Sequence, residues 1–301
     1  MAVTLPASTV GAPDLTGARA RTGRPPMNQR SRSKIGLGVR IVLALVTAVV
    51  MAFPLWIMLV TAFSGSAVFS AKLELWPTSF STGNFQRVFD AWPVATWFSN
   101  SVTVTVITTI VTVVVSTMAG YGFAKLRFPL KVPLLLLLLA TMMIPVQATL
   151  VPSFRIVNAM GLIGTFWAVI IPGAAATFGI FLARQFMLAI PVELLEAAKM
   201  DGAGTFRIFR SIVLPLCKPL LAVLTLLSLM YQWNDFLWPL IALKDPVLYT
   251  LPIGLQFLQG QYQTDYGALM AMTLVSVIPL VILFLAFQRF FVQGLATTGI
   301  R

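Results

Sequence analysis

Six long apolar segments separate the polar stretches of this 301-residue chain. A helix needs about 20 residues to cross a bilayer, and each segment is long enough. Composition agrees, because only 10% of the residues are charged and the mean hydropathy is +0.90, whereas a soluble domain carries about 25% charged residues. The sequence therefore predicts an all-α integral membrane protein with six transmembrane helices, near residues 40–63, 97–119, 132–153, 163–187, 213–233 and 267–291.

The formal net charge of +12 is distributed unevenly along the chain. If the N-terminus is cytoplasmic, all but four of the 21 Lys and Arg residues fall on the cytoplasmic side, the exceptions being Lys72, Arg87, Arg155 and Lys244. Because cytoplasmic loops of membrane proteins carry an excess of positive charge, we expect both termini in the cytoplasm. No basic face lies on a soluble module, so nucleic-acid binding is not expected.

Nucleophiles and metal ligands are scarce. The chain has no His and one cysteine, Cys217, so neither a disulfide framework nor a His/Cys metal site is expected. With few carboxylates as well, nothing resembles a catalytic set, and we expect no catalytic residues and no enzyme activity. Cys217 is expected to be a small apolar residue of a helix.

Residues 1–35 are rich in Gly, Pro, Ser, Thr and Arg, and lack an apolar period. We expect them to form a disordered, basic cytoplasmic tail, with Met27 as an alternative start. Residues 36–296 are expected to form the membrane domain, and 297–301 a short cytoplasmic tail. The first outer loop, roughly 64–96, is expected to contain short helices whose aromatic residues anchor to lipid head groups.

A polar, charged segment over residues 190–215 lies between the fourth and fifth spans. Pro191 can open a short helix in its first turn, and Gly202 can adopt the positive φ that ends it. Phe206 and Phe209, three residues apart, would share one face of a second short helix. The segment therefore predicts a helix-turn-helix knob on the cytosolic surface. An amphipathic loop lying on lipid head groups is the alternative.

The spacing Glu196-Ala197-Ala198, then Gly202, then Ile212-x-Leu214-Pro215 resembles the signature of permease subunits of ATP-binding-cassette (ABC) importers. The resemblance implies that residues 190–215, hereafter the docking loop, sit in a cleft of a separate ATPase. Glu196 would face a basic residue there, and Phe206 and Phe209 would fill an apolar pocket. The docking residues implied are Glu196, Ala197, Ala198, Asp201, Gly202, Ala203, Phe206, Phe209, Ile212, Leu214 and Pro215.

Further stretches resemble the second, six-span permease of carbohydrate importers of the maltose-type group. They lie at residues 120–128, 143–152, 190–194, 233–239 and 288–295. Gly122 departs from the usual Ala, and residues 296–301 depart from the usual Gly-Ala-Val-Lys-Gly ending, which puts a contact between this tail and the ATPases in doubt.

The resemblance implies a type I importer permease with a MetI-like core made of helices two to six. Its partners would be a homologous second permease, two ATP-binding subunits and an extracytoplasmic sugar-binding protein. No Gly-Lys dipeptide occurs, so a Walker A loop is missing, and ATP and magnesium are expected on the partner ATPases rather than as cofactors of this chain.

A sugar pathway needs amide and aromatic groups more than charges. Polar residues within or at the ends of spans are candidates, because such residues are costly unless they face protein or water. Interhelical hydrogen bonding is the alternative for each, and in this family the tight sugar site lies mainly in the other permease. Residues 260–267 either contact the binding protein or form an exposed turn. The pathway candidates are Asn100, Gln147, Tyr231, Trp233, Asn234 and Asp235.

Two rival functions remain. An ion-coupled secondary carrier usually needs ionisable groups near mid-membrane, and the central parts of the six spans hold no Asp or Glu. An importer permease for a non-sugar solute, such as a polyamine, should display several carboxylates or an aromatic cage, and the outer face offers scattered acids only. The sequence does not name the sugar.

Overall fold

The computed structural model describes the backbone of residues 29–65, 75–77, 79–259 and 264–298, and side chains between Gly38 and Gln288 within those ranges. The described part of the chain is helical, apart from one isolated β-bridge between Ser64 and Phe80. The elements are α1 (Gln29–Ala62), α2 (Gly83–Ala91), α3 (Val94–Lys125), α4 (Lys131–Thr141), α5 (Val146–Ala159), α6 (Trp167–Ala174), α7 (Thr177–Leu188), α8 (Val192–Met200), α9 (Thr205–Ile208), the π-turn η1 (Phe209–Val213), α10 (Leu214–Leu216), α11 (Lys218–Trp233), α12 (Leu237–Ala242), the 3₁₀ turn η2 (Pro246–Leu248), α13 (Leu251–Phe257) and α14 (Tyr266–Thr298).

The chain divides between Phe53 and Pro54 into two compact units. The described part of the first unit belongs to α1, which begins at Gln29. Residues 29–35 are therefore helical, and the prediction that they are disordered is wrong. Residues 1–28, including Met27, lie outside the described residues. Apolar side chains of this part of α1, such as Val49 and Met51, are exposed, as lipid contact requires.

Four helical stretches are long and apolar enough to cross a membrane, namely Gly38–Ala62, Val94–Lys125, Trp167–Leu188 and Tyr266–Gln288. Two bent pairs raise the number to as many as six, if each pair is one span. The pair α4 and α5 bends by 108°, and the stretch Thr205–Leu216 bends by 80° against α11. The all-helical prediction is confirmed. The predicted fifth span starts too early, because the straight helix begins at Lys218 and not at residue 213.

Pro145 explains the first of these bends. It is the residue before α5, in an extended conformation with ψ of 135°, so α4 cannot continue through it. The helix is thus completely broken at this point and not merely bent. Span four is also interrupted: α6 ends at Ala174 and α7 begins at Thr177. This second break was not predicted.

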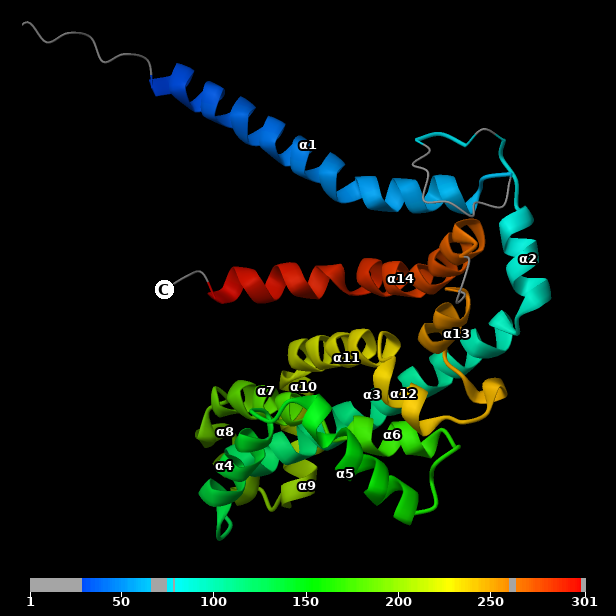
Figure 1. Ribbon diagram of the computed structural model, residues 1–301. Coiled ribbons are helices and arrows are strands. Elements are labelled where there is room, and N and C mark those ends of the chain that lie inside the picture. The colour runs from blue at the N-terminus through cyan, green and yellow to red at the C-terminus, as the bar shows by residue number, and fades with distance from the viewer. Residues whose placement is uncertain (1–28, 66–74, 78, 260–263, 299–301) are drawn as a thin grey trace, which may run out of the picture. The chain divides into compact units, whose positions relative to one another are not determined.

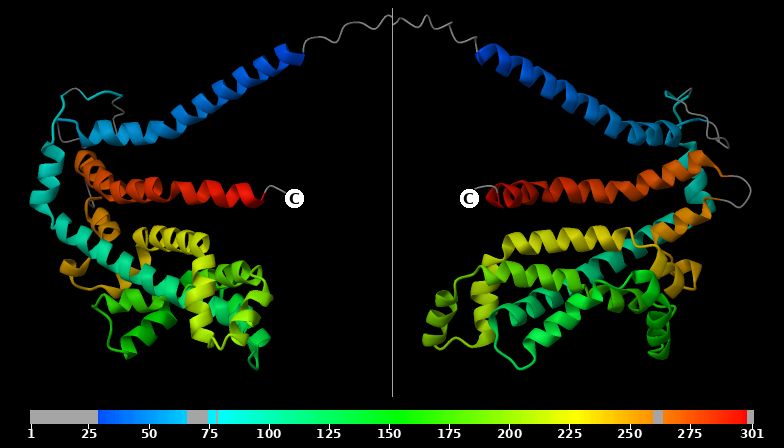
Figure 2. Two further views of the ribbon diagram at one scale, coloured as in Figure 1. Left: turned by 180° about the vertical axis from the view of Figure 1, so that it is seen from behind. Right: turned by 60° about the vertical axis from the view of Figure 1, so that its left-hand side comes forward.

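Within the second unit, α3 is the central helix and packs along α7, α11 and α6 (Figures 1 and 2). Its close approach to α7 depends on Gly120, because a Cβ atom there would lie 2.5 Å from Cβ of Ala183. The buried face of α3 is rich in hydroxyls at helical spacing. These residues are Ser101, Thr105, Thr108, Thr109, Thr112, Ser116 and Thr117.

At the opposite end of α3, the buried side chain of Asn84 in α2 holds several elements together. Its amide donates hydrogen bonds to the carbonyls of Thr61, Ala62 and Ser64, where α1 ends. Its carbonyl oxygen accepts from Arg87, which in turn pairs with Asp265 at 3.3 Å, next to the start of α14. The predicted short helix of the outer loop is thus present as α2, and it connects two long helices.

Candidate functional site

The docking loop has the predicted helix-turn-helix form. Helix α8 is followed by Gly202, whose φ is +79°, and then by α9. The Gly202 N–H donates to the carbonyl of Lys199 at 2.9 Å, and the Ala203 N–H donates to that of Ala198 at 2.9 Å. These two bonds with a left-handed glycine form a Schellman motif, which fixes the angle of the turn. Pro191 precedes α8 instead of lying in its first turn, which is a small correction.

One side of the docking loop is exposed and the other is buried in the chain's own core. Leu195, Ile208 and Val213 are buried in a cluster that also contains Met187 of α7. Among the docking residues, Ala198, Ala203, Ile212 and Leu214 are half-buried, whereas Glu196, Ala197, Asp201, Gly202, Phe206 and Pro215 are exposed.

The two phenylalanines differ in their surroundings. The ring centroids of Phe206 and Phe209 lie 6.5 Å apart, as expected for neighbours on one helix face. Phe206 is 66% exposed, but Phe209 is 7% exposed and packs against Tyr121 with 5.1 Å between centroids. The prediction that Phe209 fills a pocket of a partner is therefore wrong, because η1 turns this ring into the core. Phe206 alone of the two is free for a partner.

Lys125, the last residue of α3, holds the start of the docking loop. Its Nζ donates hydrogen bonds to the carbonyls of Ile190 at 2.6 Å and Leu188 at 3.3 Å. These carbonyls lie at and just beyond the C-terminal end of α7, where backbone acceptors lack helical partners and a positive charge is favourable. In the sequence Lys125 indicated only the cytoplasmic side. Its contact with Leu188 and Ile190 could not be predicted from the sequence, because more than 60 residues separate Lys125 from them.

The exposed charges of the docking loop form no ion pairs within the described residues, where Arg87–Asp265 is the single pair. These charges are Glu193, Glu196, Lys199, Asp201, Arg207 and Arg210. A rigid knob that carries unpaired charges of both signs around an exposed aromatic ring has the character of a protein-binding surface.

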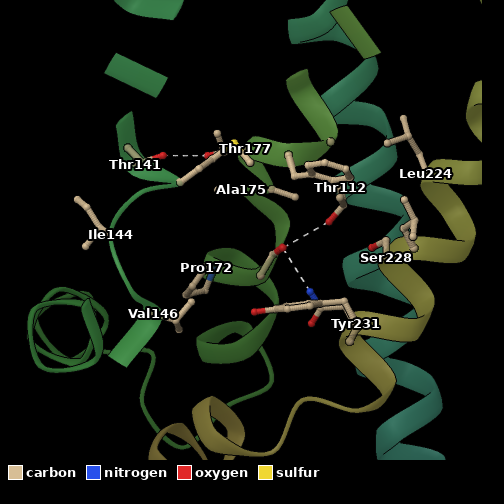
Figure 3. A pocket seen from close by; sticks show the side chains of 17 residues that line it. Thr112, Thr141, Ile144, Val146, Pro172, Ala175, Thr177, Leu224, Ser228 and Tyr231 are labelled. Atoms are coloured by element: carbon tan, nitrogen blue, oxygen red, sulfur yellow. Dashed lines mark hydrogen bonds between the residues drawn. The ribbon is translucent and has the colours of Figure 1, made fainter. Parts of the chain in front are cut away.

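A cavity of about 540 Å³ lies between α3, α11 and the two helix breaks (Figure 3). Its polar groups come from hydroxyls, one amide and one phenol, and no Lys, Arg, Asp or Glu lines it. The lining comprises Thr112 of α3, residues 141, 142, 144 and 146 around the first break, residues 172, 173 and 175–179 around the second, and Leu224, Leu227, Ser228, Tyr231 and Gln232 of α11.

Hydrogen bonds connect the walls of this cavity (Figure 3). The Gly173 carbonyl accepts from Oγ1 of Thr112 and from Nε2 of Gln232, each at 3.4 Å. The hydroxyls of Thr141 and Thr177 lie 3.1 Å apart and connect the two helix breaks. Oγ of Ser228 has no hydrogen-bond partner, although the side chain is buried.

The structure brings together half of the predicted pathway residues. Tyr231 lines the cavity and, with Asn234, Asp235, Phe236 and Leu237, a second pocket of about 410 Å³. Neither pocket includes Asn100, Gln147 or Trp233. Asn100 donates to the carbonyls of Val247 and Tyr249, and Trp233 donates to that of Ser276, so both act as interhelical or loop contacts.

Sequence reasoning missed the hydroxyls of the cavity, Thr112, Thr141, Thr177 and Ser228. Serine and threonine are common in packed membrane helices, so composition did not single them out. The one signal in the sequence was the presence of Pro145 and Pro172 within apolar runs, since proline interrupts helices and both interruptions border the cavity. Residues 260–263 of the predicted outer contact lie outside the described residues. Among the described residues, no cluster of His, Cys, Asp or Glu could hold a metal ion.

Residues 112–297 match the family model described as "Binding-protein-dependent transport system inner membrane component". The arabinooligosaccharides transport system permease protein AraQ of Halalkalibacterium halodurans is 37% identical over 75% of this chain and 81% of the relative. The lactose transport system permease protein LacG of Rhizobium radiobacter is 34% identical over 81% and 89%, respectively.

The sn-glycerol-3-phosphate transport system permease protein UgpE of Yersinia pestis is 31% identical over 84% of this chain and 94% of the relative. A chain from the crystal structure of a bacterial ABC transporter involved in the import of the acidic polysaccharide alginate aligns with a TM-score of 0.78 and 24% identity. That alignment covers 89% of this chain and all of the other chain, and it supports the fold.

Proposed function

The chain belongs to the binding-protein-dependent transport system inner membrane components, the permeases of ABC importers, and on this premise we propose that it moves a sugar across the cytoplasmic membrane. It would form half of the gate, with a homologous second permease as the other half. Two separate ATP-binding subunits would drive the gate, and an extracytoplasmic binding protein would deliver the sugar. Both termini and the docking loop would lie in the cytoplasm.

The observation that carries the proposal is the form of the docking loop. The Schellman turn at Gly202 fixes the shape of the loop, and the hydrogen bonds from Lys125 with the buried cluster around Met187 tie it to α3 and α7. A push on the loop therefore moves packed helices as one body. Glu196 and Phe206 stand exposed on its outer side. A loop of this form suits the transmission of force from an ATPase to the membrane helices.

A carbohydrate is favoured over other solutes. The relatives named for arabinooligosaccharides and lactose support this class, and the uncharged, hydroxyl-lined cavity suits a neutral polyol. The relative named for sn-glycerol-3-phosphate keeps an anionic solute as the alternative. A phosphate ester would normally be met by Arg or Lys, and neither lines the cavity.

The test is reconstitution of the chain with its second permease and ATPase subunits in lipid discs. ATPase activity is measured after addition of the binding protein loaded with members of a panel of mono- and oligosaccharides and with glycerol phosphate. Stimulation by a sugar-loaded binding protein is expected. If only the binding protein loaded with glycerol phosphate stimulates the ATPase, the transported solute is an anion and not a sugar. Sugar movement by this chain alone, without ATP, would contradict the importer and favour an ion-coupled carrier.

A further inference from the structure

The cavity described above has walls that ordinary transmembrane helices do not provide. Both of its interrupted sides, at residues 142–145 and 175–176, lie outside the regular α-helices, and several of their N–H groups pair in turns with the carbonyl three residues back. Such backbone is tolerated at membrane depth only where it is buried in protein or lines a water-filled space. Helix α7 starts beside this space without a side-chain cap, and its first three residues, Thr177, Phe178 and Gly179, line the cavity. The first N–H groups of a helix have no partners within it, and they are therefore free to donate.

Ser228 supplies an independent indication. The residue is 9% exposed and lines the cavity, while its hydroxyl oxygen is itself covered and has no hydrogen-bond partner. A buried hydroxyl without a partner is unfavourable, so such groups in native proteins usually have a water or ligand to bond with. Ser228 and Tyr231 project from α11 toward the space that Thr112 approaches from α3 (Figure 3). An unpaired hydroxyl in the wall of a cavity points to a polar occupant.

The chemistry of the lining limits that occupant. No ionised side chain lines the cavity, so a charged ligand would lack a counter-ion. The hydroxyls of Thr112 and Thr141 already donate to backbone carbonyls, so they can only accept from a sugar, whereas Ser228 and Gln232 can donate as well as accept. This set of donors and acceptors matches the hydroxyls of a sugar. The Tyr231 side chain is 62% exposed and can pack against the apolar face of a sugar ring. A volume of about 540 Å³ lies within the usual range for small-molecule sites.

We propose that this cavity is a sugar-binding site belonging to this subunit, occupied by one or two sugar units during transport. The inference rests on the importer function proposed above. It assigns to this chain a solute contact through α11 and the two helix breaks.

The test uses the complete transporter in lipid discs and three variants of α11. Ser228→Leu fills the cavity with an apolar side chain, and Ser228→Ala removes the hydroxyl while leaving the space. Thr225→Leu is the matched control, because it makes the same kind of change one turn earlier on α11 at a residue that does not line the cavity. Sugar uptake, ATPase stimulation and the amount of co-purified second permease are measured for each.

We expect Ser228→Leu to lower uptake by about tenfold or more, because it occupies the cavity as well as removing a polar contact. Ser228→Ala should lower uptake by a smaller factor, because it removes the polar contact only. Assembly and Thr225→Leu uptake should stay at the wild-type level. Normal uptake by Ser228→Leu would overturn the proposal. So would loss of the second permease from that variant, because the cavity would then be filled by the partner. Failure of the importer function itself would be distinguishable, because the wild-type complex would then show no uptake.

A labelling experiment tests occupancy independently of transport rate. In Ser228→Cys, a small thiol reagent reports access to the cavity, and the wild-type chain is the control because its single cysteine, Cys217, is buried. Transported sugar, supplied with its binding protein while the ATPase is arrested by a non-hydrolysable nucleotide, should slow labelling several-fold. Equal labelling rates with and without sugar would contradict binding at this place.

Discussion

At the scale of single residues, the turn of the docking loop depends on Gly202. Its φ of +79° lies in the left-handed region, and a Cβ atom there would meet no atom within 4 Å. Glycine is therefore required at this position because of the backbone conformation, and not because a side chain would clash with a neighbour. The sequence predicted this position correctly, because a glycine that follows a short helix is the commonest way to end one.

Gly202→Val should uncouple the ATPase. A β-branched residue at positive φ costs about 1–3 kcal/mol, so the loop should shift to another turn. The expected result is reduced ATPase co-purification and uptake with normal membrane insertion. Gly204→Val is the control, because φ of −69° and ψ of 162° suit valine and a Cβ there also has open space. Wild-type transport by Gly202→Val would contradict the role of the turn.

Lys125 is a positioning residue for the same loop. In Lys125→Met the hydrogen bonds to Leu188 and Ile190 are lost, and the start of α8 should open more often. Hydrogen exchange of amides at residues 188–196 should accelerate by about tenfold, the change expected for loss of a charge-assisted contact. Arg127→Met, at an exposed residue nearby, should leave exchange unchanged. Equal exchange in both variants would show that Lys125 does not hold the loop.

At the scale of elements, the docking loop has an inner face and an outer face, and the two phenylalanines lie on different ones. Phe209→Ala should lower the thermal stability of the subunit, since removal of a buried Phe side chain costs about 3–5 kcal/mol. Phe206→Ala should leave the melting temperature unchanged but weaken ATPase binding, by about 2 kcal/mol for a central interface residue. The reverse assignment of the two effects would show that η1 turns the other way in the membrane.

The same elements show what sequence patterns can and cannot predict. The helix-turn-helix loop follows from local signals at Pro191 and Gly202, and most spans follow from apolar length. The burial of Phe209 does not follow, because a three-residue spacing places two rings on one face without saying where the face meets the core. The break between α6 and α7 was missed because Pro172 and Gly173 lie in an otherwise continuous apolar run. Tertiary contacts with Thr112 and Gln232 stabilise the freed carbonyl there.

Pathway residues were harder to predict than the docking loop, because tertiary packing and not local sequence decides which of them line a cavity. Asn100, Trp233 and Tyr231 look alike in the sequence, as polar or aromatic residues at the ends of spans. Only the packing separates Tyr231, which lines the cavity, from Asn100 and Trp233, whose polar atoms bond to backbone carbonyls. Ser228 lies in a strongly apolar stretch and gains its meaning only from the cavity beside it.

At the scale of the whole molecule, the orientation in the membrane is a prediction from charge. Lys199→Cys on the docking loop and Asp90→Cys on α2 each add one thiol at an exposed position. A membrane-impermeant maleimide should label Asp90→Cys in cells whose outer layers are permeable to it, and Lys199→Cys only after the cytoplasmic membrane is opened. The buried Cys217 of the wild type gives the background. The opposite pattern would reverse the predicted topology.

The central claim at this scale is that an external ATPase acts on the membrane helices through the docking loop. The most direct measurement is binding-protein-stimulated ATPase activity of the complete complex carrying Glu196→Lys, with Asp90→Lys as a control that makes the same charge change on an exposed residue of α2. The account predicts that Glu196→Lys loses the ATPase or its stimulation while inserting normally, and that Asp90→Lys behaves as wild type. Normal ATPase co-purification and stimulation in Glu196→Lys would contradict it.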